Sequence, residues 1–178
     1  CDDAVWSAIT HFTQGVQISL VIGYNQLNRG TAFESGGADY AEWLKKYDEN
    51  ETLTYGDVVG VKSGEISARF SDAEKFMVIS QNPTVIGAMP LQDNLHRHKK
   101  VAFIGQVPVK VLGEVHKGEY ILPSGNGDGM AIAVHPDQMR IHDYKRIVGV
   151  AWDEYHGNEL FSLINTAVGI NTNDLSNE

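Results

Sequence analysis

The sequence predicts an all-β fold, a compact barrel or sandwich of short antiparallel strands. After Lys46, short β-branched and aromatic segments follow one another at close intervals, and turn signals that contain glycine separate them. No long helical pattern occurs in this part of the chain. The 178 residues are 42% hydrophobic and 21% charged, which is sufficient for one folded domain with a sizeable core.

The first third of the chain is expected to lie outside this domain. Apolar residues between Asp3 and Phe12 have a spacing compatible with a short helix. Residues 15–24 alternate polar and apolar side chains before a β-branched run, which predicts a strand, and a polar loop follows. The predicted organisation is an upstream fibre shaft or linker over residues 1–34, the β domain over 35–170 and a polar tail over 171–178.

Within the β domain the first predicted strands form a hairpin. Residues 57–62 and 65–70 are joined by a tight turn at Ser63-Gly64, and a further turn is predicted at Tyr55-Gly56-Asp57. Residues 76–80 are expected to form a buried strand. It ends at Asn82-Pro83, because proline fixes its own backbone angle and restrains the residue before it.

The longest apolar segment covers residues 100–113. Val107, Val109 and Val111 alternate with other residues, which predicts a strand with one face in the core. Pro108 cannot donate a backbone hydrogen bond, so this part of the strand is expected at an edge or bulge. Two further strand pairs are predicted, residues 120–122 with 130–134 and residues 146–152 with 160–169.

Charge and composition limit the partners. A net charge of −9 argues against a nucleic-acid surface, which requires clustered Lys and Arg. No apolar run approaches the roughly 20 residues of a membrane-spanning helix. The single cysteine, Cys1, cannot form an internal disulfide. The histidines of the last third, His135, His142 and His156, have no tight metal-ligand spacing, so we expect no metal and no cofactor.

The segment from Glu34 to Trp43 carries the candidate chemistry. It combines the hydroxyl of Ser35, two glycines and the carboxylates of Asp39 and Glu42. In an extended segment Asp39 would point away from Glu42, because successive side chains alternate faces. Gly36 and Gly37 can adopt backbone angles closed to other residues, which would let Ser35 approach Asp39 as a nucleophile approaches its base. The alternative interpretation is a glycine turn entering a strand whose acids face solvent.

Four segments carry a resemblance to a known family. In chain order they are GGADYAEW, GDVVGVKSGEI, VISQNPTVIG and VAFIGQVPVKVLGEVHKGEYILPSG. Together they resemble the intramolecular-chaperone autoproteolytic cleavage domain of phage neck-appendage and tail-fibre proteins. The match extends from about Ser35 to Val134, and more weakly to Gly169. ADYAE and NPTVIG are its specific parts.

The resemblance implies a function and a set of roles. The implied cut falls between Glu34 and Ser35, with Ser35 as nucleophile. Asp39 would serve as the general base or position it. Glu42 would polarise water or hold the geometry, with action from the opposite face through a neighbouring chain as one option. No cofactor is needed. The resemblance also implies a homotrimer at the end of a tail fibre or bacterial surface fibre, in the virion or at a cell surface, where it would face a host-surface or extracellular receptor.

Two alternatives of different classes stay open. One is a non-catalytic structural or adhesin β domain that keeps the family scaffold and mediates trimerisation or surface binding. The other is a hydrolase that acts on an external polymer, for which the sequence offers no acid pair whose separation can be judged.

Overall fold

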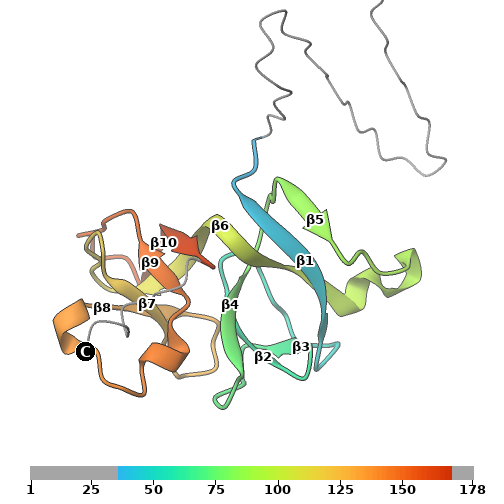
Figure 1. Cartoon of the computed structure of the whole chain (residues 1–178), viewed down its shortest axis with the longest axis horizontal. Helices are drawn as coiled ribbons and strands as arrows, with labels where there is room; N and C mark the ends of the chain where they lie inside the picture. Colours follow the sequence, from blue (N-terminus) through green and yellow to red (C-terminus); the bar gives the residue numbers. More distant parts are fainter. Residues whose placement is uncertain (1–35, 170–178) are drawn as a thin grey trace, which may run out of the picture. The chain divides into compact units, whose positions relative to one another are not determined.

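The computed structural model describes residues 36–169 (Figure 1). The predicted helix over residues 3–12, the predicted strand over 15–24 and the predicted polar tail lie outside this range. The described part consists of strands with three short 3₁₀ helices, which confirms the all-β prediction. None of the helices in residues 36–169 has the length and apolar character needed to cross a membrane.

The strands, in chain order, are β1 (Asp39–Lys46), β2 (Val58–Lys62), β3 (Glu65–Ser67), β4 (Lys75–Ile79), β5 (Val85–Gly87), β6 (His98–Leu112), β7 (Tyr120–Pro123), β8 (Ala131–Val134), β9 (Gly149–Ala151) and β10 (Phe161–Val168). The 3₁₀ helices are η1 (Gln92–Arg97), η2 (Pro136–Gln138) and η3 (Tyr144–Arg146). The predicted hairpins β2–β3, β7–β8 and β9–β10 are confirmed as antiparallel pairs. Most pairings are antiparallel, as the sequence predicts, and β1–β3, β1–β5 and β6–β8 are parallel.

Five strands close into a barrel. β1 pairs with β3, β3 with β2, β2 with β4 and β4 with β6, and β6 returns to β1. Closure gives each of the five strands a partner on both sides. β5 lies beside the N-terminal half of β1, outside this ring (Figure 1).

The second half of β6 belongs to another closed set of pairings. It pairs with β10 and β8, and β8, β7, β9 and β10 are joined in sequence. β6, which has 15 residues, is therefore shared by two rings of strands and passes between them in Figure 1. We call these rings the first and the second barrel.

β6 changes partners at Gly105. This residue pairs with Asp39 of β1 and with Val168 of β10. Its φ is +123°, and a Cβ atom there would lie 2.4 Å from the carbonyl oxygen of Ala38. The position where β6 changes partners thus requires a glycine, both for its backbone angle and for the close approach of β1.

The core contains two clusters of buried apolar side chains. On β2 the adjacent residues Val58 and Val59 face different clusters, because side chains of a strand alternate. The larger cluster, on the side of the second barrel, includes Val107, Val109 and Val111, each at most 1% exposed. The alternation predicted for this segment is confirmed.

Pro108 lies where it was expected. It faces Asn165 of β10 on one side, and on the other side β8 pairs with β6 only at Val111 and Leu112. The missing backbone N–H therefore falls on a stretch of β6 with a single neighbouring strand, and it interrupts no central ladder.

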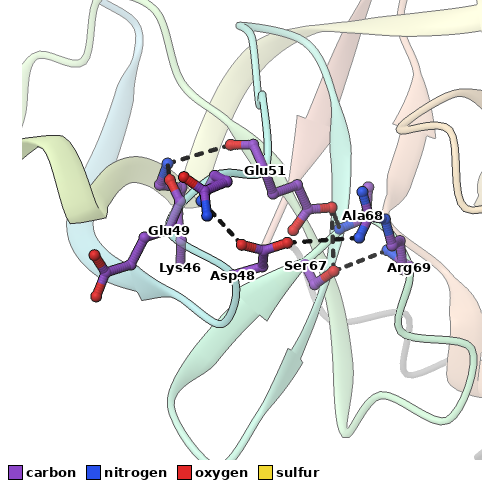
Figure 2. A network of polar contacts seen from close by, with 8 residues as sticks. Lys46, Asp48, Glu49, Glu51, Ser67, Ala68 and Arg69 are labelled. Carbon is purple, nitrogen blue, oxygen red and sulfur yellow. Dashed lines mark hydrogen bonds and ion pairs between the residues drawn. The ribbon is translucent and has the colours of Figure 1, made fainter.

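Strand β3 ends at Ser67, three residues before the predicted end, at a network of polar contacts that Figure 2 shows. The Oε1 atom of Glu51 accepts hydrogen bonds from the hydroxyl of Ser67 at 3.1 Å and from the backbone N–H of Ala68 at 3.0 Å. Lys46 is 6% exposed, and its ammonium donates to the carbonyl oxygens of Glu49 and Glu51. These bonds fix the loop after β1 against the end of β3 and divert the backbone from a strand partner.

Candidate functional site

The two predicted catalytic carboxylates lie on opposite faces of β1. Asp39 and Ala41 are buried, at 5% and 0% exposed, whereas Tyr40 and Glu42 lie partly exposed on the other face. The predicted alternation is therefore confirmed. The two carboxylates therefore face opposite sides of β1.

Asp39 is held by a serine that the sequence analysis did not single out. Its Oδ1 atom accepts a hydrogen bond from the hydroxyl of Ser80 at 3.1 Å. Ser80 is 4% exposed and directly follows β4. The other carboxylate oxygen, Oδ2, is buried and has no hydrogen-bond partner among the described residues. One oxygen of Asp39 is thus engaged and the other is available as an acceptor.

The environment of Asp39 favours its protonated form. Burial raises the pKa of the Asp39 carboxyl above its ordinary value of 3.8, and it outweighs the hydrogen bond from Ser80 and the positive charge of Lys100, which act in the opposite direction. The Lys100 ammonium donates to the carbonyl oxygen of Gln81 at 2.9 Å. A carboxylate with a raised pKa accepts protons more readily near neutral pH than an ordinary one does.

The backbone before Asp39 packs tightly against the Asn82-Pro83-Thr84 turn. Neither Gly36 nor Gly37 has a positive φ. A Cβ atom on Gly37 would lie 2.5 Å from the carbonyl oxygen of Asn82 and 2.5 Å from the backbone nitrogen of Thr84. Gly37 is therefore required for this close approach, whereas a Cβ atom on Gly36 would meet nothing within 4 Å.

This contact joins the two most specific segments of the family resemblance, ADYAE and NPTVIG. The backbone N–H of Thr84 donates to the carbonyl oxygen of Asp39 at 2.7 Å. Directly after it, Val85 and Ile86 of β5 pair in parallel with Tyr40 and Ala41 of β1. Figure 1 shows β5 alongside β1. Segments about 40 residues apart in the sequence thus form one structural unit around Asp39.

Glu42 lies on the partly exposed face of β1, next to Tyr40. Its Oε1 atom accepts a hydrogen bond from the phenol of Tyr40, and this bond raises the pKa of Tyr40 above its ordinary value. Gly87 of β5 leaves room for the pair, since a Cβ atom there would lie 2.7 Å from the Tyr40 oxygen. The Glu42 carboxylate is accessible from outside the chain on this face.

The remaining predicted site residues, Glu34 and Ser35, lie outside the described residues. The first described residue, Gly36, follows Ser35 directly, so Ser35 is four positions before Asp39. Ser80 could have been found from the sequence, because it belongs to the VISQNPTVIG segment that carries the resemblance. It was missed because the candidate residues were sought among the acids close to Ser35 in the sequence, and Ser80 is a hydroxyl residue far from them.

The three histidines considered for a metal do not meet one another. His135 lies 3.5 Å from the carboxylate of Asp137, and His142 lies 3.2 Å from that of Asp143, both local contacts. His156 instead contacts Glu114, at 2.7 Å between its Nδ1 atom and the Oε1 atom.

Comparisons with known proteins reveal structural similarity. No protein-family model matches the chain, and no curated protein matches it. The crystal structure of a C-terminal fragment of gene product 12 of bacteriophage phi29 has a TM-score of 0.51 and 13% identity, covering 73% of this chain and 99% of the fragment. The crystal structure of the pre-mature form of that protein has a TM-score of 0.54 and 12% identity, covering 80% of this chain. This chain corresponds to 24% of the pre-mature protein's length, and at these identities the likeness is one of fold.

Proposed function

We propose that this chain is an assembly and maturation domain of a phage tail fibre or bacterial surface fibre, and that it cleaves its own backbone between Glu34 and Ser35. The resemblance of its segments to the autoproteolytic cleavage domain supports the activity. Its fold, shared with bacteriophage phi29 gene product 12, supports the coarser assignment to a phage protein. One neighbour is a pre-mature form and another a C-terminal fragment, which is compatible with a parent protein that has a precursor form.

The proposed reaction is an acyl shift followed by hydrolysis. The Ser35 hydroxyl loses its proton to Asp39, and its oxygen attacks the carbonyl carbon of Glu34. The C–N bond to Ser35 breaks, the Ser35 nitrogen takes up a proton, and an ester joins Glu34 to the Ser35 oxygen. Water then cleaves the ester, which leaves a carboxylate at Glu34 and a free amino group at Ser35.

The observation that carries the proposal is the state of Asp39. A general base needs an acceptor atom within hydrogen-bond reach of the nucleophile and a pKa nearer neutrality than that of an ordinary carboxyl. Asp39 has a buried Oδ2 atom without a partner among residues 36–169, and burial raises its pKa. Ser80 fixes the other oxygen, so the acceptor is held in one orientation. A hydroxyl from Ser35 would satisfy Oδ2.

The proposal includes assembly as a homotrimer in the virion or at a cell surface, with a host-surface or extracellular receptor as partner. A globular end domain has a physical use in such a fibre. Repeated β strands slip past one another at little cost unless a specific structure fixes their register. An end domain that assembles first would set the alignment, and the cut would then release it.

A second candidate is favoured by the Asp39–Ser80 hydrogen bond itself. This bond ties the start of β1 to the end of β4 inside the first barrel, and a structural role explains it without any reaction. In this reading the chain is a non-catalytic structural or adhesin domain on the same scaffold.

The two candidates are separated by expressing the full chain and its variants and measuring intact mass. Wild-type chain is expected to yield a fragment that starts at Ser35, and Ser35→Ala and Asp39→Asn are expected to stay whole while folding normally. Asp93→Asn, an exposed acid on η1, is the matched control and should be cut like wild type. A wild-type chain that stays intact under every assembly condition would support the structural candidate.

Glu42 requires a separate test, because it faces away from Asp39. If it acts on the Ser35 region of a neighbouring chain, an uncut Glu42→Gln chain should become cleavable when it is mixed during folding with Ser35→Ala chains, which still carry Glu42. A tagged Glu42→Gln chain that stays whole in the mixture would exclude action between subunits. A Glu42→Gln chain that is cut normally by itself would remove Glu42 from the reaction.

A further inference from the structure

Three metal-ligating side chains that are dispersed in the sequence gather on the surface beside the second barrel. Glu114, His116 and His156 each offer one ligand atom, and these atoms lie within 4.8 Å of one another. The Oε1 atom of Glu114 is 2.7 Å from Nδ1 of His156 and 3.6 Å from Nε2 of His116. The two imidazole rings meet edge to face, with their centres 5.2 Å apart.

The backbone explains why these side chains meet. Val115 and Tyr155 form an antiparallel bridge with two hydrogen bonds, of 2.9 and 2.8 Å. Val115 is fully buried, so its neighbours Glu114 and His116 both point outward. In an antiparallel bridge the residue after Tyr155 is opposite the residue before Val115, which places His156 beside Glu114.

Surrounding residues fix the backbone that carries two of the three side chains. The carboxylate of Glu119 accepts a hydrogen bond from the backbone N–H of His116 at 2.8 Å and lies 3.6 Å from Nδ1 of the same residue. A carboxylate next to the second ring nitrogen is the usual partner of a metal-binding histidine. Tyr155 packs against the core cluster, and its phenol accepts from the backbone N–H of Glu159 at 3.1 Å, which anchors the loop that carries His156.

We propose that Glu114, His116 and His156 bind one divalent transition-metal ion of the zinc class. Two imidazoles and one carboxylate are a ligand set that zinc accepts with a position left for water or an outside donor. Calcium and magnesium prefer sites built from oxygen alone. Zinc bonds of about 2.0–2.2 Å place tetrahedral ligand atoms about 3.3 Å apart. The ligand atoms of this cluster lie within 4.8 Å of one another, so they need to move by about 1 Å or less on average to bind the ion.

Charge and access favour the same ion. The ordinary pKa of a glutamate carboxyl is about 4.3, so Glu114 brings a negative charge to the cation at neutral pH. Glu114, His116 and His156 are all exposed, so an ion in solution can reach them, and His116 also lines a neighbouring surface pocket with Glu119 and His135. The site belongs to the second barrel, whereas Asp39 belongs to the first, so it is independent of the proposed self-cleavage.

The test is calorimetric titration of the metal-stripped full chain with zinc chloride at about pH 7.5, where imidazole nitrogens are largely unprotonated. A Cys1→Ser background removes the thiol as a competing ligand. We expect saturation near one equivalent. His156→Ala and Glu114→Gln should weaken zinc binding at least about tenfold. Even the loss of a residue that only hydrogen-bonds to a metal ligand lowers metal affinity by about that factor. His142→Ala, an exposed histidine beside Asp143, is the matched control and should bind like wild type.

A second readout reports the ligands directly. Cobalt(II) added in place of zinc should give the visible absorption of a four- or five-coordinate ion, and His116→Ala should abolish it. The proposal is overturned if wild type shows no saturable binding, or if the Glu114, His116 and His156 variants bind zinc as tightly as the control.

Discussion

Gly37→Ala tests whether the close contact between β1 and the Asn82-Pro83-Thr84 turn holds the candidate site together. The added methyl group would lie 2.5 Å from two backbone atoms of the turn and 2.6 Å from the carbonyl carbon of Pro83. Ordinary contacts begin near 3.4 Å, so the turn has to withdraw by almost 1 Å. Backbone atoms cannot rotate away as a flexible side chain can.

The expected cost is about 2–3 kcal/mol of unfolding free energy. Overpacking of this kind costs about 1–3 kcal/mol. The hydrogen bond from Thr84 to Asp39, now 2.7 Å, would be stretched or lost, at about 1 kcal/mol. A gain of about 0.4–1 kcal/mol opposes these losses, because alanine restricts the unfolded chain more than glycine does.

Urea unfolding measures the difference, and Gly36→Ala is its matched control. A methyl group on Gly36 meets nothing within 4 Å, and its φ is not positive, so the control should be neutral or slightly stabilised. For an m-value of about 2 kcal/mol/M, the midpoint of Gly37→Ala should fall by about 1–1.5 M. If the two alanine variants have equal midpoints, the tight docking of β1 on this turn is refuted.

Two further predictions concern buried charge. The pKa of Asp39 is raised in the folded state, so wild type loses stability as the pH rises from 3.8 through the pKa of the folded state. Asp39→Asn does not titrate at this position. Its stability relative to wild type should therefore increase over this pH window. Urea midpoints at several pH values would test it, and a difference that does not vary with pH would contradict it. Lys110→Met should cost about 2–4 kcal/mol, because the Lys110–Asp57 ion pair, 2.6 Å long, is largely buried and the Asp57 carboxylate would lose its countercharge. The more exposed pair Lys45–Glu65 is the control, and an equally small effect of breaking both pairs would argue against the prediction.

Most of the strands from β2 onward were predictable because their signals are local. Alternating valines, glycine turns and the Asn82-Pro83 dipeptide fix the face and the ends of a strand within a few residues. Ring closure is not local. The double use of β6 depends on Gly105, whose neighbours in space come from β1 and β10, and no short window of sequence shows both. The early end of β3 likewise depends on Glu51, 16 residues before Ser67.

For the candidate sites too, the local features were predictable from the sequence and the contacts between distant residues were not. The opposite orientation of Asp39 and Glu42 follows from strand geometry alone, and the structure confirms it. The partner of Asp39 is Ser80, 41 residues away, and the partner of Glu114 is His156, 42 residues away. Such pairs are set by strand register, which a single sequence does not reveal.

The two roles open for Asp39 can be separated without knowing where Ser35 lies. Ser80→Ala removes the hydrogen bond to Oδ1 and leaves the carboxylate in place, so it should lower stability under either role. Asp39→Asn preserves the shape of the side chain and an oxygen that can still accept from Ser80, but it cannot take up a proton from a serine. A structural role therefore makes Ser80→Ala the more harmful change by every measure. If Asp39 is a general base, Asp39→Asn becomes the more harmful change for cleavage, but not for stability. A folded Asp39→Asn chain would then stay whole, whereas the less stable Ser80→Ala chain would still be cut.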